Sequence, residues 1–292
     1  MSGRRVFEKV LIPTDFSMHA RKVIECVGKI PTVKEIVLLH VISRSVITRV
    51  WDPAAELKEV EKKLTEEKKI IVASGIDVKI RAVSVLEGEV AKVIQNVARE
   101  EKVSLVVMGT RGKSRIESVF LGSVFKGVLR FGDTHLLVIL YKVLENGNLE
   151  KHCARMLAKV LFPVDLSQPA EVALSIFKNL QGIGELVLLN VVSTGETDEE
   201  IDANVASATQ KVNEIARQLS DGGLKITPKV IVGYPVEEIQ SLAETEDISL
   251  IAIYFQDAAV IKKGRVRSIA YDVVNSATRP VLILRRSKEE LP

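Results

Sequence analysis

The chain has 292 residues, of which 47% are hydrophobic and 27% charged, and its 41 basic and 38 acidic side chains leave a formal net charge of +3. This length suits about two domains, and the composition supplies enough apolar side chains for two buried cores. The near balance of charge gives no reason to expect nucleic acid or a membrane as a partner.

The start of the chain, Met1–Val6, carries positive charge but leads into no apolar signal segment. No apolar run approaches the roughly 20 residues of a membrane span. We therefore expect a cytoplasmic protein. The two cysteines, Cys26 and Cys153, lie at unrelated positions and predict no disulfide framework. Neither they nor the four histidines show the spacing of metal ligands, so we expect no metal site.

Apolar, β-branched runs alternate with segments of helical periodicity, which is typical of a parallel sheet with crossover helices. In the first half we predict strands at 8–13, 35–42, 76–83, 103–109 and 136–141. Helices are predicted at 18–29, 53–74, 88–100 and 121–131. The Glu and Lys residues of the second helix predict a solvated face, with Leu57, Val60 and Leu64 directed inward.

The second half repeats the first. Lys9–Ser17 reads KVLIPTDFS and Lys159–Ser167 reads KVLFPVDLS, and Glu35–Val41 has a similar counterpart at Glu185–Val191. The polar, turn-forming Glu145–Asn148 separates the copies, so the boundary is expected between residues 142 and 156. A repeat of this length is a duplicated domain rather than a solenoid unit.

One segment of the first copy is suited to phosphate. Gly109 and Gly112 follow the predicted strand, and after nine further residues Gly122 and Ser123 open a predicted helix. Glycine lets a ligand approach the backbone, and the N–H groups at a helix start attract anions. A P-loop is excluded because Val107 occupies the position of its first glycine. The turn at 13–17 also lacks the glycines of a dinucleotide-binding fingerprint.

This Gly-x-x-Gly, nine residues, Gly-Ser pattern resembles the ATP-binding signature of the universal stress protein family, and Lys9–Ser17 and Ile36–Val41 resemble the family's first two strands. The resemblance implies an α/β fold of two tandem open-sheet domains, at 1–145 and 155–292. Each would be a five-stranded parallel sheet in the order 3-2-1-4-5 with helices on both faces. The sheet would reverse its winding between strands one and four, where Asp15 and Gly109 would face one crevice.

By resemblance, Asp15 would hydrogen-bond the ribose, Val41 would offer backbone groups to adenine, and the glycines would surround the phosphates. The alternative for Asp15 is a helix N-cap, and Thr14 or Ser17 is expected either to cap the helix or to touch the ligand. Arg111 is either near the phosphates or part of a solvated basic loop. The predicted nucleotide-binding residues are Pro13, Thr14, Asp15, Val41, Met108, Gly109, Arg111, Gly112, Gly122, Ser123 and Val124.

The second copy lacks this pattern. Tyr254–Asp257 replaces the first glycines and Arg267-Ser268 replaces Gly122-Ser123, although Asp165 matches Asp15. We expect one ATP, ADP or AMP per chain, any Mg²⁺ being carried by the nucleotide, in a stress-response regulatory or sensing module. A nucleotide-free interaction protein and a slow ATPase are the alternatives. The final strands of the two copies are expected to pair as an intramolecular pseudo-dimer, and a homodimer is a further expectation.

Overall fold

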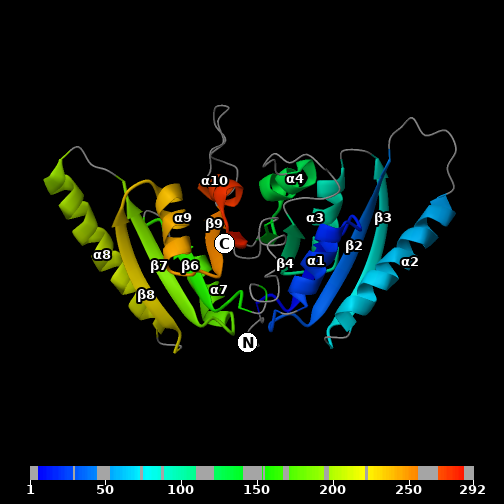
Figure 1. Ribbon diagram of the computed structural model, residues 1–292, viewed down its shortest axis with the longest axis horizontal. Coiled ribbons are helices and arrows are strands. Elements are labelled where there is room, and N and C mark those ends of the chain that lie inside the picture. Colours follow the sequence, from blue (N-terminus) through cyan, green and yellow to red (C-terminus); the bar gives the residue numbers. More distant parts are fainter. Residues whose placement is uncertain are drawn as a thin grey trace. The chain divides into compact units, whose positions relative to one another are not determined.

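The computed structural model (Figure 1) describes residues 6–28, 30–44, 53–72, 75–86, 89–109, 122–140, 153, 155–166, 171–193, 197–220, 223–255 and 269–285. The chain forms two compact units. We call Phe7–Ala154 with Ser287–Pro292 the N-terminal unit, and Arg155–Arg286 with Met1–Val6 the C-terminal unit. Each unit contains one set of five parallel strands in the order 3-2-1-4-5.

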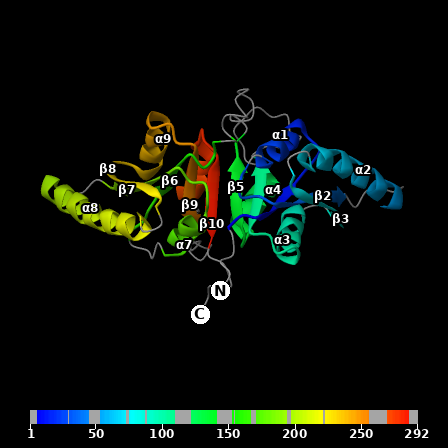
Figure 2. The same cartoon turned by 90° about the horizontal axis from the view of Figure 1, so that it is seen from below.

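The N-terminal unit has its strands in the order β3-β2-β1-β4-β5. These strands are β1 (Lys9–Pro13), β2 (Glu35–Arg44), β3 (Asp77–Leu86), β4 (Leu105–Gly109) and β5 (His135–Ile139). The helices are α1 (Met18–Val27), α2 (Pro53–Val72), α3 (Val90–Glu100) and α4 (Ser123–Phe131). Helix α1 packs with α2 and α3 with α4, which places one pair on each face of the sheet (Figure 2).

Helix α2 buries one stripe of a strongly charged sequence. Val60, Leu64 and Ile71 are buried, at the spacing of one helix face, whereas Leu57 near the start of the helix is exposed. The prediction was therefore right for Val60 and Leu64 and wrong for Leu57. Gly75 then adopts φ +76°, and its N–H donates to the carbonyl of Val72, the last residue of the helix, at 3.0 Å. Glycine suits this left-handed position because it has no Cβ.

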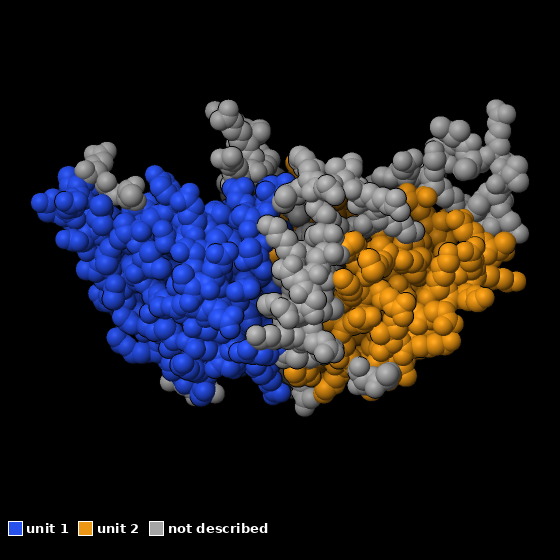
Figure 3. All heavy atoms as spheres, in the orientation of Figure 1, with its two compact units in different colours: residues 1–6, 155–286 blue, residues 7–154, 287–292 orange. Residues whose placement is uncertain are grey.

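The C-terminal unit, drawn in blue in Figure 3, has the order β10-β9-β6-β7-β8. These strands are β6 (Lys159–Pro163), β7 (Glu185–Val192), β8 (Lys225–Val232), β9 (Leu250–Phe255) and β10 (Val281–Arg285). The helices are α7 (Glu171–Asn179), α8 (Asp198–Ser220), α9 (Pro235–Thr245) and α10 (Ile269–Ser276). Gly223 follows α8 at φ +79° and is the counterpart of Gly75. The duplication seen in sequence is thus a duplication of topology.

The predicted strands and helices of the first half are confirmed to within a few residues. The last strand of the N-terminal unit begins at His135, whose ring packs edge-on against Phe7 with centroids 5.7 Å apart. Pairing of the final strands of the two units concerns their relative placement and stays a prediction. Among the described residues, no helix is long and apolar enough to cross a membrane.

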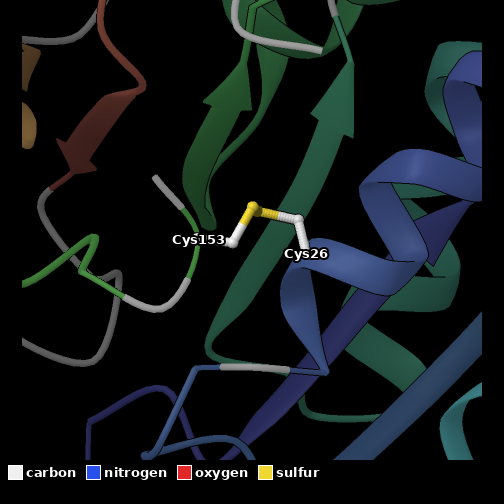
Figure 4. The surroundings of a disulfide bond; sticks show 2 residues. All are labelled: Cys26 and Cys153. Carbon is white, nitrogen blue, oxygen red and sulfur yellow. A yellow bond between two sulfur atoms is a disulfide. The ribbon is translucent and has the colours of Figure 1, made fainter. Parts of the chain in front are cut away.

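The expectation for the cysteines was wrong, because Cys26 and Cys153 form a disulfide (Figure 4). Their Cα atoms are 5.1 Å apart although 127 residues separate them in sequence. Both side chains are buried, Cys26 on the inner face of α1. Folding brings them together through tertiary packing of the N-terminal unit, which a spacing argument along the chain does not detect.

Candidate functional site

The turn after β1 is fixed by its own side chains. The Phe16 N–H donates to Thr14 Oγ1 at 3.1 Å, and the Ser17 N–H donates to Asp15 Oδ1 at 3.0 Å. Ser17 Oγ then accepts from the Ala20 N–H at 3.1 Å, so Ser17 is the N-cap of α1. Thr14, Asp15 and Ser17 were the candidates for the cap of this helix, and the structure shows that Ser17 is the cap. Asp15 shapes the turn instead and stays half-buried beside the end of β1.

The ring of His40 on β2 supports this turn. The carbonyl of Thr14 lies 2.8 Å from His40 Nδ1, and since a carbonyl only accepts, Nδ1 carries the proton. The His40 ring stacks on Phe16 with centroids 4.4 Å apart, and Phe16 has the left-handed φ of 60°. This backbone conformation is energetically unfavourable for a bulky residue. The stack and the hydrogen bonds of the turn compensate for that strain and hold Phe16 in place.

Val41 lies where β2 extends past its neighbour. The register of β1 and β2 ends with Pro13 opposite Leu39, and the Thr14 N–H donates to the Leu39 carbonyl at 2.8 Å. Beyond this point β2 continues beside β3 as far as Arg44. Because backbone groups of a strand alternate sides, the amide and carbonyl of Val41 face the same side as those of Leu39. They point to the region beyond the end of β1.

The third part of the site is the end of β4 and the start of α4. Met108 is buried, and Gly109 is the last residue of β4. Gly122 is the N-cap residue of α4 and offers no side chain to the first-turn N–H groups. Ser123 is exposed and Val124 half-buried. This end of the helix therefore presents backbone donors and the positive end of the helix dipole.

The sheet places these parts next to one another. β1 lies between β2 and β4, with Val10 opposite Leu105, and all three strands run in the same direction. Pro13, Thr14, Asp15, Val41, Met108 and Gly109 consequently lie at one edge of the sheet, where its winding reverses. Arg111 and Gly112 lie outside the described residues, so their predicted roles stay predictions.

Sequence reasoning missed Glu67 at this edge. Its side chain is only 8% exposed, and its Oε1 accepts a hydrogen bond from Thr14 Oγ1 at 3.2 Å. Burial raises the pKa of Glu67 above its usual value, against the opposing effect of the Thr14 hydrogen bond. A signal was available, because Glu67 occurs between Leu64 and Ile71 at the spacing of the buried face of α2.

The corresponding edge of the C-terminal unit is built differently. β9 ends with Tyr254 and Phe255, and the Arg285 guanidinium lies 5.0 Å from the centre of the Phe255 ring. Asp165 is exposed after β6. The Val164 carbonyl accepts from Asn190 Nδ2 at 2.9 Å, as the Thr14 carbonyl does from His40. The scaffold of the turn is thus kept, while glycine is replaced by aromatic residues.

Residues 7–139 and 156–285 each match the sequence profile of the universal stress protein family. Because these two matches span most of the chain, the protein belongs to the universal stress protein family. Universal stress protein MJ0577 of Methanocaldococcus jannaschii is 28% identical over 157 residues, which covers 45% of this chain and 96% of that protein. Universal stress protein MJ0531 of the same organism is 29% identical over 148 residues, covering 47% and 85% respectively.

A solved relative shares the tandem architecture. The crystal structure of a universal stress protein from Archaeoglobus fulgidus matches with a TM-score of 0.72 at 22% sequence identity. The match covers 98% of this chain and 99% of that chain. At this level of identity the likeness establishes the fold, and the chemistry of the site has to be argued from this chain's own residues.

Proposed function

We propose that the N-terminal unit binds one adenine nucleotide, ATP, ADP or AMP, at the edge formed by β1, β2, β4 and α4. The protein then acts as a nucleotide-dependent regulatory or sensing module of the stress response. The proposal rests on the resemblance of its glycine pattern to the family's ATP-binding signature. It also rests on how the described residues are arranged at this edge.

Gly122 is the observation that carries the proposal. Its φ of −58° and ψ of 155° are accessible to any residue. A Cβ added there would meet no atom of the described residues within 4 Å. Within the part of the chain that the structure describes, neither backbone conformation nor packing therefore requires glycine at this position. A phosphate lying against the first turn of α4 supplies the missing reason, because a side chain would occupy that space.

The remaining groups of the site fall into two sets, one suited to the phosphates and one suited to the nucleoside. Gly122, Ser123 and Val124 present amides and a hydroxyl, which suit the phosphates. Asp15 offers a carboxylate to the ribose, and Val41 offers an amide and a carbonyl to the base. Among the described residues, no group of three or more His, Cys, Asp or Glu side chains could hold a metal ion. We propose that any Mg²⁺ is carried by the nucleotide.

We propose binding rather than fast hydrolysis. A general base for water would need a carboxylate poised toward the γ-phosphate. Oδ1 of Asp15 already accepts from the Ser17 N–H, and this proposal assigns the Asp15 carboxylate to the ribose. The C-terminal unit, with Tyr254 and Phe255 in place of the glycines, serves in this proposal as a structural or partner-binding domain.

The test is to identify and count the bound molecule. Native mass spectrometry of the purified protein should reveal copurified adenine nucleotide, and calorimetry of nucleotide-free protein with ATP, ADP and AMP should saturate near one equivalent. Two equal sites would contradict the assignment of the C-terminal unit. Failure of all three nucleotides to bind would favour the alternative, a protein that acts through docking surfaces alone.

A further inference from the structure

A buried polar pair joins α2 to the turn after β1 in the N-terminal unit. Thr14 and Glu67 are 5% and 8% exposed, and Thr14 Oγ1 donates to Glu67 Oε1. The second carboxyl oxygen, Oε2, is also buried, and none of the residues that the structure describes forms a hydrogen bond with it. Most buried carboxyl oxygens in folded proteins are hydrogen-bonded, so this one requires an explanation.

Keeping this carboxyl inside the protein is unfavourable. Burial raises its pKa, the Asp15 carboxylate acts in the same direction, and Arg21 on α1 opposes them. A buried acid with an unsatisfied oxygen destabilises the folded state relative to an apolar side chain of similar size. The position would therefore be filled by an aliphatic residue if only packing mattered.

The C-terminal unit has an aliphatic, half-buried residue at the corresponding position. Gly75 follows α2 as Gly223 follows α8, so the two helices can be aligned from these glycines. In this alignment Leu64 corresponds to Val212, and both side chains are fully buried. The same alignment pairs Glu67 with Ile215.

The partner of Glu67 changes as well. Thr14, the first residue after β1, corresponds to Val164, the first residue after β6. In each unit the N–H of this residue donates to the second strand of the sheet, to Leu39 or Leu189, at 2.8 Å. Both members of the polar pair are thus aliphatic in the unit that lacks the glycine pattern.

We infer that Glu67 is a nucleoside-binding residue, whose Oε2 accepts a hydrogen bond from a ribose hydroxyl or the 6-amino group of a bound adenine nucleotide. The inference rests on the proposed function. A phosphate oxygen has no hydrogen to donate to Oε2, so the partner is a donor group of the nucleoside. The ligand's phosphates accordingly lie toward α4 and its nucleoside toward α2, with Thr14 holding the Glu67 carboxyl in position.

The experiment measures nucleotide affinity after removing either partner of the proposed hydrogen bond. Each ATP analogue lacks one donor group of the nucleoside, and the variant lacks the acceptor on Glu67. Calorimetry is run on the full-length protein and on Glu67→Ile, which adopts the residue of the C-terminal unit. The ligands are ATP, 2′-deoxy-ATP, 3′-deoxy-ATP and inosine triphosphate. We expect the parent to lose about tenfold in affinity for one analogue, the scale of a hydrogen bond to a charged group. Glu67→Ile should bind ATP about tenfold more weakly, with no further loss for that same analogue.

Stability measurements separate binding from structure. Glu67→Ile should unfold at the same denaturant concentration as the parent or a higher one. Should Glu67→Ile fail to fold, Glu67→Gln keeps the size and replaces one oxygen by a donor, and it should show the same loss for ATP. If the folded variant bound ATP as tightly as the parent, the role of Glu67 would be wrong. The same would follow if the substitution weakened binding of ATP and of every analogue by the same factor. Either result would leave the proposed function standing. A parent that binds none of the four ligands would overturn the proposed function, and this inference with it.

Discussion

The two units keep the same charge network at one edge of the sheet and differ at the other. At the amino ends of the strands, Glu101 accepts from Lys79 at 2.8 Å and from Arg81 at 2.5 Å. Its counterpart Glu246 accepts from Lys159 at 2.8 Å. Because a network of this kind is present in both units, we infer that it stabilises the fold and is not part of a ligand site.

At the carboxyl ends several features occur in the N-terminal unit only. These are the glycine pattern, the pair of Thr14 with Glu67 and the stack of Phe16 on His40. In the C-terminal unit Val164 and Ile215 stand in place of the polar pair, and Tyr254 stands in place of Gly109. Leu166 and Asn190 replace Phe16 and His40. A duplicated fold thus acts as an internal control, because polar groups that one copy does without are not required for folding.

The disulfide is a further difference, and its loss should give the largest effect. Cys153→Ser should lower the free energy of unfolding of the N-terminal unit by about 4 kcal/mol, because the bond closes a loop of more than 100 residues in the unfolded chain. Hydrogen exchange should show faster opening of β1 but not of β6. Equal loss in both units would contradict this view. Thiol titration before and after reduction checks that the bond is present in the purified protein.

Gly122→Val tests the phosphate end of the site. The valine side chain would occupy the space in front of α4, so nucleotide affinity should fall by about 3 kcal/mol. The fold should tolerate the change, because a Cβ at this position meets none of the described atoms within 4 Å. Calorimetry and thermal unfolding measure the two quantities. Arg267→Val, at the sequence-equivalent position of the C-terminal unit, is the matched control and should leave affinity unchanged. Parental affinity in folded Gly122→Val would remove α4 from the site.

Asp15→Ala and Asp165→Ala compare the two turns directly. Loss of a charged hydrogen bond to ribose should cost Asp15→Ala about 2 kcal/mol of nucleotide affinity, whereas Asp165→Ala should bind as the parent does. Asp15→Asn keeps an acceptor for the Ser17 N–H and so preserves the turn. If Asp15→Ala lost stability but kept its affinity, the residue would serve the turn alone.

Glu101→Gln and Glu246→Gln should have similar, smaller effects of about 1–2 kcal/mol on unfolding. Hydrogen bonds from Lys79 and Lys159 hold the pKa of Glu101 and Glu246 below the usual value. Their stabilisation is complete above the unfolded pKa of about 4.3 and is lost as pH falls through the lower folded pKa. Denaturant titrations should therefore show the variants and the parent converging in acid. A penalty unchanged at low pH would show that packing, not charge, explains it.

Sequence patterns predicted the strands because strands depend on local features. An apolar run such as that of β4 predicts a buried strand, and a glycine such as Gly75 predicts the end of a helix. Each prediction depends on only a few neighbouring residues. The disulfide and Glu67 depend on tertiary packing instead. Cys26 and Cys153 share no motif, and Glu67 is hidden in a helix rich in surface Glu and Lys. The left-handed φ of Phe16 likewise follows from its contact with His40 on a neighbouring strand.

The disulfide also decides what becomes of a chain that is cut. One peptide bond broken anywhere between Cys26 and Cys153 leaves two fragments joined through sulfur. They migrate as one species in a denaturing gel until a thiol reductant is added. A cut between residues 155 and 286 separates the pieces at once, since both cysteines precede it. Limited proteolysis with and without reductant can therefore distinguish a cut between the two cysteines from a cut outside them before any fragment is sequenced.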